Sequence, residues 1–255
     1  MLLSCEIIEL NNEKCRLITL NDITDYKKME DKMASLERLN LIGQMAAGIG
    51  HEIRNPMTTV RGFLQMYRNK DSFIKYKETF NLMIDELDRA NSIITEFLSL
   101  AKNKPVNLTL KNINRIVQKI LPLIQADATN NEMVVEVELT EVIDLLLDEE
   151  EIIQLVLNLV RNGFEAMTAG KRLKIKTFLD GNQVVLAVED QGSGIKPEIL
   201  DKLGTPFFTT KENGTGLGLS VCYGIAERNN ATINIETGPS GTTIFVRFDD
   251  FAGML

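Results

Sequence analysis

A long helical periodicity in the first part of the chain constrains the fold more than any other feature. Between residues 25 and 69, apolar side chains recur every three or four positions, which is the repeat of one face of an α-helix. Soluble helices average about 10–14 residues, so this run is unusually long. A second run with the same steps spans residues 80–101 and contains Asn91, which we expect to fix helix register. The two runs predict a helical hairpin over residues 25–102.

The apolar seams of this hairpin also predict a partner. Two helices alone bury little surface, and pairing with a second copy into a four-helix bundle covers both seams. We therefore expect a homodimer. The polar, proline-containing stretch Lys102-Asn103-Lys104-Pro105 then ends the helix and marks a domain boundary.

Beyond this boundary the pattern becomes that of an α+β domain over residues 103–255. Strands and helices alternate there in lengths typical of a layered fold. The expected helices are 112–128, 149–167 and 216–229, and the expected strands are 133–139, 172–179, 183–190, 231–236 and 242–248.

Before the helical hairpin, residues 5–10 and 15–20 flank the turn-like Asn11-Asn12-Glu13-Lys14, which predicts a β-hairpin. Two strands alone are marginal in water, so this pair indicates part of a larger sheet. The step through Asp22-Ile23-Thr24 into a helix resembles the end of a PAS sensor domain. We expect residues 1–24 to be the C-terminal remnant of such a domain.

Composition excludes several classes of protein. A formal net charge of −8 argues against a nucleic-acid-binding surface, which needs clustered positive charge. The three cysteines lack disulfide or metal-ligand spacing and are expected to be packing thiols. We find neither a signal peptide nor an apolar run long enough to span a membrane. The sequence thus predicts a cytoplasmic fragment, and it leaves open whether a longer parent protein is membrane-anchored.

The only histidine of the chain, His51, lies within the long helical run in Gly48-Ile-Gly-His-Glu-Ile-Arg-Asn-Pro56. Asn55 lies one turn further on the same helix face, and the flexible side chain of Glu52 can reach the imidazole. A carboxylate that accepts from one ring nitrogen makes the other more nucleophilic, which suits a phosphoryl acceptor. An isolated His-Glu pair is more often an ordinary surface feature. Motifs in the second domain favour the chemical interpretation.

Two of these motifs indicate groups that could bind a metal ion and an adenine ring. Asn158 and Asn162 lie one turn apart on the predicted helix 149–167, and uncharged oxygen ligands suit Mg²⁺ held mainly by water and phosphates. Asp190 ends a predicted strand, and its carboxylate can accept from an adenine amino group. Gly192 and Gly194 follow it and allow the backbone to approach a ring closely.

Two further motifs indicate phosphate binding. A glycine-rich loop before the last predicted helix can bind phosphates through backbone amides and the helix N-terminus. Upstream, Pro206-Phe-Phe-Thr-Thr-Lys211 places paired aromatics and a lysine on a long loop that is suited to closing over a ligand. Each motif alone is weak, and paired asparagines are usually a solvated or capping pair. The residues of the glycine-rich loop are Gly214, Thr215, Gly216, Leu217, Gly218 and Leu219.

In this order, the motifs resemble those of the two-component sensor histidine kinases, over residues 22–248. The resemblance implies a dimerisation and phosphotransfer bundle followed by a Bergerat-type (GHKL) ATP-binding domain. Sporulation-type and nitrogen-regulatory kinases are the most similar, through Gly43-Gln-Met-Ala-Ala-Gly48, Val60-Arg-Gly-Phe63 and Gly204-Thr-Pro-Phe-Phe-Thr-Thr-Lys211. Departures are Gly50, Met57 and Glu165, the last of which stands where some branches carry lysine.

The family's functional residues carry over onto matching positions. They imply His51 as the nucleophile, Glu52 as the general base and Asn55 as a position for γ-phosphate contact and phosphatase chemistry. In the second domain they imply Asn162 as the Mg²⁺ ligand, Asn158 in phosphate contacts, Asp190 in adenine recognition, and Gly192, Gly194, Lys211 and the glycine-rich loop in ATP binding.

The resemblance therefore implies a protein-histidine kinase that transfers phosphate from Mg-ATP to His51 and then to an aspartate of a response-regulator receiver domain, within a sporulation phosphorelay in the nearest branch. It also leaves room for a protein inhibitor that docks on the bundle. Two alternatives stay open at this point. A gyrase-like or chaperone-like ATPase clamp leaves the His51 motif unused, and a non-catalytic scaffold leaves the nucleotide motifs unused.

Overall fold

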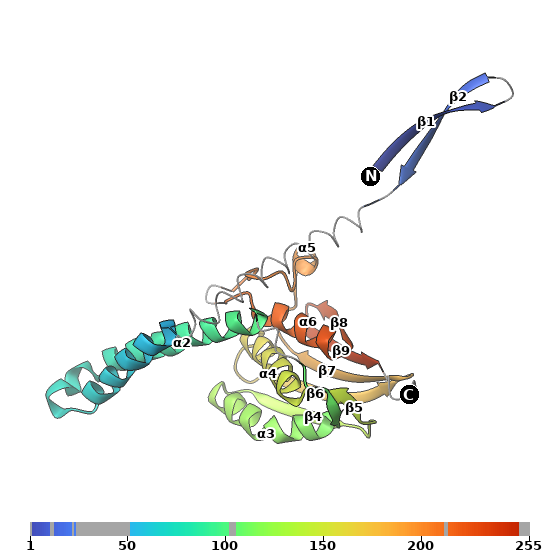
Figure 1. Ribbon diagram of the computed structural model, residues 1–255. Coiled ribbons are helices and arrows are strands. Elements are labelled where there is room, and N and C mark those ends of the chain that lie inside the picture. Colours follow the sequence, from blue (N-terminus) through green and yellow to red (C-terminus); the bar gives the residue numbers. More distant parts are fainter. Residues whose placement is uncertain are drawn as a thin grey trace.

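The computed structural model describes residues 2–10, 13–21, 23, 52–101, 106–211 and 214–249 of the chain (Figure 1). At the N-terminus, strands β1 (Leu2–Leu10) and β2 (Glu13–Asn21) pair antiparallel along their full length, with Leu2 opposite Asn21. The predicted β-hairpin is confirmed. Within the described residues the two strands form a sheet of their own, so their origin in a PAS domain stays a prediction.

Two antiparallel helices form the next unit. The first is helical over residues 52–68, and the second is α2 (Lys77–Ala101), with the 3-10 helix η1 (Asp71–Tyr76) between them. The part of the predicted helix before residue 52, including His51, lies outside the described residues. Three aromatic rings pack together where the chain turns. Their centroid separations are 5.4 Å for Tyr67–Phe73, 6.5 Å for Tyr67–Phe80 and 6.2 Å for Phe73–Phe80.

A ladder of arginines sets the register of this hairpin. The arginines stand seven residues apart on the first helix, and on α2 three of their partners, Asn81, Asp88 and Thr95, also recur every seven residues, which is about two helical turns. The contacts are Arg54 with Thr95 and Asn91 (both 3.1 Å), Arg61 with Asp88 (2.7 and 3.1 Å) and Arg68 with Asn81 (3.2 Å). A shift of one helix along the other would break all three rungs together. Asn91 thus has the cross-helix contact expected of a register residue.

The second unit is built on a five-stranded mixed sheet of order β4-β6-β7-β9-β8. Only β4 and β6 run parallel, and the other neighbours are antiparallel. Strand β7 is buried along most of its length, as its central place requires. The strands are β4 (Val134–Leu139), β6 (Arg172–Asp180), β7 (Gln183–Asp190), β8 (Ala231–Gly238) and β9 (Gly241–Asp249).

Three helices cover one face of this sheet: α3 (Ile113–Asn130), α4 (Glu149–Ala166) and α6 (Gly218–Arg228) (Figure 1). Their buried faces and the sheet form one hydrophobic cluster, which includes the fully buried side chains Leu155, Leu159 and Phe248. Cys222 also lies in this core, where burial raises its pKa to about 12, as expected for a packing thiol. The α+β fold class predicted from the sequence is confirmed.

A buried polar contact joins α4 to α6. Asp148 caps α4 by accepting from the backbone amides of Glu150 and Glu151. Its own backbone amide donates to Asn229 Oδ1 at 2.8 Å, and Asn229 Nδ2 donates to Glu151 Oε2 at 2.8 Å. Asn229 is 2% exposed and directly follows α6. The contact therefore holds the start of α4 against the end of α6.

Three short elements of the second unit were not predicted. Strands β3 (Thr109–Lys111) and β5 (Leu145–Leu147) pair with each other, and α5 (Pro197–Leu200) is a single turn. Elements of three or four residues are too short to show a hydrophobic period. Among the helices within the described ranges, none is long and apolar enough to cross a membrane.

Candidate nucleotide-binding site

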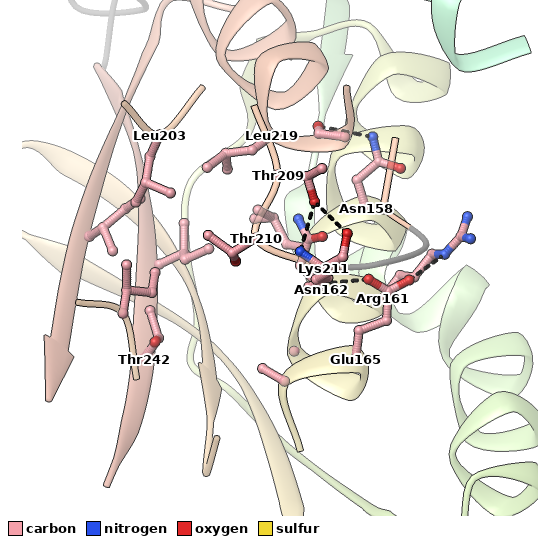
Figure 2. Close-up of a pocket in the computed structure, with 18 of the residues that line it drawn as sticks. Asn158, Arg161, Asn162, Glu165, Leu203, Thr209, Thr210, Lys211, Leu219 and Thr242 are labelled. Atoms are coloured by element: carbon pink, nitrogen blue, oxygen red, sulfur yellow. Dashed lines mark hydrogen bonds and ion pairs between the residues drawn. The ribbon is translucent and has the colours of Figure 1, made fainter. Parts of the chain in front are cut away.

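A cavity of about 390 Å³ opens between α4, α6 and the end of β7 (Figure 2). Its volume falls in the usual range for small-molecule sites, which is about 300–1,000 Å³. Most of the residues predicted to bind ATP contribute to its wall. They are Asn158, Asn162, Asp190, Gly194, Lys211, Gly214, Thr215, Gly216, Gly218 and Leu219.

Two predicted residues do not line the cavity. Gly192 lies behind Asp190, where an added Cβ would come within 2.6 Å of the Asp190 Oδ1 atom and 2.8 Å of the Ala166 carbonyl oxygen. Leu217 is 1% exposed, and its side chain enters the core below the loop. Both residues shape the wall from behind, and their predicted part in ATP binding stays a prediction. Their types are set by packing, which a motif in the sequence cannot distinguish from ligand contact.

Asp190 is a buried residue whose carboxylate keeps one oxygen available to accept a hydrogen bond. It is 9% exposed, and its Oδ1 accepts from the backbone amides of Gly192 at 2.7 Å and Thr242 at 3.3 Å. Burial raises the pKa of this carboxyl, while the two amides and the charges of Lys211 and Lys171 oppose that shift. The hydrogen bonds found within the described part of the chain engage only Oδ1. Oδ2 is therefore available to accept from a ligand donor.

Part of the cavity wall is apolar. Aliphatic side chains from the sheet, from the loop after β7 and from α6 line the cavity together with Asp190, and Figure 2 shows Leu203 and Leu219 among them. A flat ring with an amino group suits such a wall, because it buries apolar area and satisfies one polar group. The aliphatic residues are Val188, Ile195, Ile199, Leu203, Leu219, Ile235 and Ile244.

The two asparagines of α4 project to the other end of the cavity. Asn158 Nδ2 lies 3.5 Å from the Gly218 carbonyl oxygen, which places it beside the start of α6. Asn162 lies near the same helix end, with its Nδ2 4.0 Å from where a Cβ on Gly218 would be. Within the described ranges, the Asn162 amide has no protein hydrogen-bond partner. A half-exposed, unpaired amide on a cavity wall is available for a ligand.

These groups fit a hydrated magnesium ion. In the part of the chain that the structure describes, no cluster of histidine, cysteine or acidic side chains could hold a metal by itself. An ion at this position would therefore take Asn162 as its protein ligand and complete its shell with water and phosphate oxygens, as Mg²⁺ commonly does. The oxygen ligands available at this position therefore fit Mg²⁺.

The glycine-rich loop packs tightly against the loop that carries Lys211. Gly216 has φ +68°, and its carbonyl oxygen accepts from the Phe207 amide at 3.0 Å. A Cβ on Gly216 would lie 2.8 Å from both the Cα and the carbonyl oxygen of Phe207. Glycine is therefore required here both by the backbone angle and by the close approach. The loop leads into α6, whose N-terminus carries a partial positive charge suited to phosphate.

Charged side chains that the sequence did not connect lie at the same end of the cavity. Glu165 accepts from Lys211 Nζ at 2.6 Å and from Arg161 Nε at 3.1 Å (Figure 2). All three residues line the cavity. The i, i+4 spacing of Arg161 and Glu165 on a helix predicts their contact. No sequence signal predicts the contact with Lys211, which stands 46 residues further along the chain.

The helical hairpin contributes no residue of 52–101 to this cavity. Glu52 and Asn55 lie on the first helix and are exposed, while His51 lies outside the described residues. The catalytic roles that the sequence predicts for these three therefore stay predictions. Helix α2 does contact α6, so the two units meet beside the helix that borders the cavity.

The fold and cavity together define the class of the protein: a Bergerat-type nucleotide-binding layer that follows a helical hairpin. Comparisons with known proteins agree. Residues 147–251 match the family model of the histidine kinase-, DNA gyrase B-, and HSP90-like ATPases, and residues 41–105 match the His Kinase A (phospho-acceptor) domain. With both modules in this order, the chain belongs to the sensor histidine kinases, as the sequence motifs predicted.

Curated relatives include the sporulation kinases. Sporulation kinase C of Bacillus subtilis is 32% identical over 237 residues, which cover 89% of this chain and 55% of the relative. Sporulation kinase E of the same organism is 34% identical over 235 residues, covering 91% of this chain and 32% of the relative. The chain thus spans about half, or less, of the length of these relatives.

Solved structures share the fold. Histidine kinase ThkA in complex with response regulator protein TrrA is 25% identical, with a TM-score of 0.63, and the match covers 99% of this chain and 80% of that one. Full-length ShkA in complex with AMPPNP has a TM-score of 0.70 over 80% of this chain and 45% of that one. At 19% identity, the ShkA match supports the fold alone.

Proposed function

We propose that this chain is the core of a protein-histidine kinase that binds Mg-ATP in the cavity, phosphorylates His51 and passes the phosphoryl group to an aspartate of a response-regulator receiver domain. The observation that carries the proposal is one cavity in which a buried carboxylate, an unpaired helix amide and a glycine-rich helix N-terminus lie together. The match of residues 147–251 to the histidine kinase-, DNA gyrase B-, and HSP90-like ATPase model supports a nucleotide ligand. We retain the three-part division into 1–24, 25–102 and 103–255 as part of the proposal.

In this reading, each wall of the cavity binds one part of the nucleotide. Asp190 accepts from the adenine amino group, while the aliphatic side chains enclose the ring. The Gly216 amide and the N-terminus of α6 hold the phosphates, beside Gly214 and Thr215 of the glycine-rich loop. Asn162 and the phosphate oxygens hold Mg²⁺, which supplies charge neutralisation at the γ-phosphate. Asn158 and Lys211 support the phosphate end.

The transfer itself needs a nucleophile and a base. A lone pair of the neutral His51 imidazole forms the N–P bond as the bond between the γ-phosphorus and its bridging oxygen breaks, and ADP leaves. Glu52 takes the proton from the other ring nitrogen, and Asn55 contacts the transferred group. The phosphoramidate is labile, so the group can pass on to a receiver carboxylate.

A second copy of the chain completes the hairpin in this proposal. Large apolar side chains remain exposed along both helices, while Ile84 between them is 5% exposed. Exposed apolar rows of this extent are typical of surfaces that bind another protein. Pairing of two hairpins into a four-helix bundle would cover them. The exposed residues are Ile53, Val60, Phe63, Met66, Tyr67, Leu82, Met83 and Ile93.

The complex of ThkA with TrrA supports a receiver domain as the other partner, and the names of the curated relatives support a place in a sporulation phosphorelay. A protein inhibitor that docks on the bundle stays a prediction.

The test is incubation of the purified chain with Mg²⁺ and γ-³²P-ATP, followed by acid and alkali treatment of the labelled protein. We expect an acid-labile, alkali-stable label that His51→Gln abolishes while nucleotide binding persists. Label retained by His51→Gln would reject the assignment. Release of inorganic phosphate with no phosphohistidine would support the ATPase clamp instead, and no nucleotide binding would support the scaffold.

A further inference from the structure

Glu165 forms ion pairs with the cationic side chains at the phosphate end of the cavity. Its Oε2 lies 2.6 Å from Lys211 Nζ, and its Oε1 lies 3.1 Å from Arg161 Nε. The first contact joins α4 to the loop that ends in Lys211, and the second stays within α4 (Figure 2). Both sides of the bridge line the cavity. One carboxylate thus bridges two positive groups at the wall of the cavity.

The bridge is well placed but exchangeable. The side chains of Lys211 and Glu165 are 38% and 39% exposed, and that of Arg161 is 61% exposed. Ion pairs with this much contact to water are weak, because solvent screens the charges. A nucleotide triphosphate carries several negative charges and offers multiple oxygens to the same cations, so it competes effectively with a single carboxylate.

We propose that Glu165 is a specificity-determining residue, a carboxylate latch that holds Lys211 and Arg161 until a polyphosphate displaces it. The inference rests on the proposed function, since it assumes that the cavity binds ATP. Nucleosides gain nothing from displacing the latch and leave it closed. Nucleoside di- and triphosphates must displace Glu165 to reach Lys211 and Arg161, so the latch lowers the affinity of the cavity for them. The latch also couples movement of the Lys211 loop to binding of the phosphate chain.

The effect on nucleotide affinity depends on the charge of the side chain at position 165. A lysine here would add a third cation to the phosphate end and attract nucleotides with many phosphates. The carboxylate does the opposite, because it neutralises two cations and repels phosphate until it moves away. Binding would then depend more strongly on Mg²⁺, which reduces that repulsion by neutralising the phosphates.

The experiment measures the affinity of the full chain for adenosine, MgADP and MgATP by calorimetric titration in one buffer. Glu165→Gln keeps the side-chain size and removes the charge. We expect it to strengthen MgATP binding by about 3- to 10-fold, MgADP binding by less, and adenosine binding not at all. In a Lys211→Met background the gain from Glu165→Gln should shrink to under about 2-fold, because the main cation is gone.

Asp180→Asn is the matched control. It breaks an ion pair of the same length, 2.6 Å to Arg247 Nη1, and changes the net charge equally, but Asp180 does not line the cavity. Its nucleotide affinities should equal those of the parent chain. Unchanged or weaker MgATP binding by Glu165→Gln overturns the latch, as does an equal gain for adenosine. If the parent chain binds neither adenosine nor MgATP, the proposed function itself fails, which is a separate outcome.

Discussion

Replacing Gly216 by alanine should reduce nucleotide binding far more than it reduces the stability of the fold. The residue has φ +68°, so any side chain brings the strain of the left-handed region, about 1–2 kcal/mol. Part of this is offset because alanine restricts the unfolded chain more than glycine does, by about 0.4–1 kcal/mol. The strain alone therefore costs about 1 kcal/mol, a fall in melting temperature of about 2–4 °C for a chain of this size.

The second effect of Gly216→Ala is local. The new Cβ would meet the backbone of Phe207, with both the Cα and the carbonyl oxygen at 2.8 Å, and backbone atoms cannot rotate away as a side chain can. The Phe207 segment has to retreat by at least about 0.6 Å to reach an ordinary contact. That shift moves the glycine-rich loop and the Lys211 loop apart. We expect MgATP affinity to fall at least about 10-fold and phosphate transfer about 100-fold.

Gly170→Ala is the control for this experiment. Gly170 has φ +81° but nothing within 4 Å of an added Cβ, so it reports the backbone strain without a collision. Thermal melts should show the strain cost in both variants and a further loss in Gly216→Ala from the collision, and calorimetric titration should show a loss of MgATP binding for Gly216→Ala alone. Affinities within 2-fold of each other in the two variants would refute the argument that the close approach of Phe207 and Gly216 shapes the site.

Three further predictions follow from other contacts. Burial raises the pKa of Asp190 above the ordinary aspartate value near 4, so adenosine binding should weaken as pH falls through that raised pKa, and Asp190→Asn should bind weakly at every pH. Since the folded-state pKa exceeds the unfolded one, ionised Asp190 disfavours folding, and its contribution to stability should improve as pH falls; a contribution that improves with rising pH in urea melts would contradict this. Asn229→Ala should cost about 2–3 kcal/mol in urea unfolding, because it leaves the buried Asp148 amide unpaired, and a loss under about 0.5 kcal/mol would show that the contact is unimportant. Reversing the charge of Arg61 alone, as Arg61→Asp, should reduce helicity by circular dichroism, and adding Asp88→Arg should restore it; no rescue by the second change would contradict the register ladder.

Much of the fold follows from local periodicity. The predicted helix 149–167 and strand 183–190 agree closely with α4 (Glu149–Ala166) and β7 (Gln183–Asp190), because α4 repeats its apolar residues with the helical period and β7 is one continuous apolar run of strand length. Strands β3 and β5 were missed, since each has only three residues and is defined by its partner rather than by a pattern of its own.

The same distinction holds at the candidate site. Asn158 and Asn162 could be placed on one helix face because they stand four residues apart, and Asp190 could be placed at a strand end. Their common cavity agrees with the order of the motifs. The supporting positions of Gly192 and Leu217 could not be predicted, because a motif records which residues occur and not whether they face a ligand or the core behind it.

The sequence by itself determined the longer helices and strands and the chemical groups available to the site, since these depend on residues near one another in the chain. Only the tertiary structure decided that Glu165 meets Lys211 and that Asn229 meets the amide of Asp148. These contacts join residues 46 and 81 positions apart. The physical reason is that such contacts depend on how whole elements pack around a shared core. The spacing of residues along a connecting loop does not specify where in space the next element will lie.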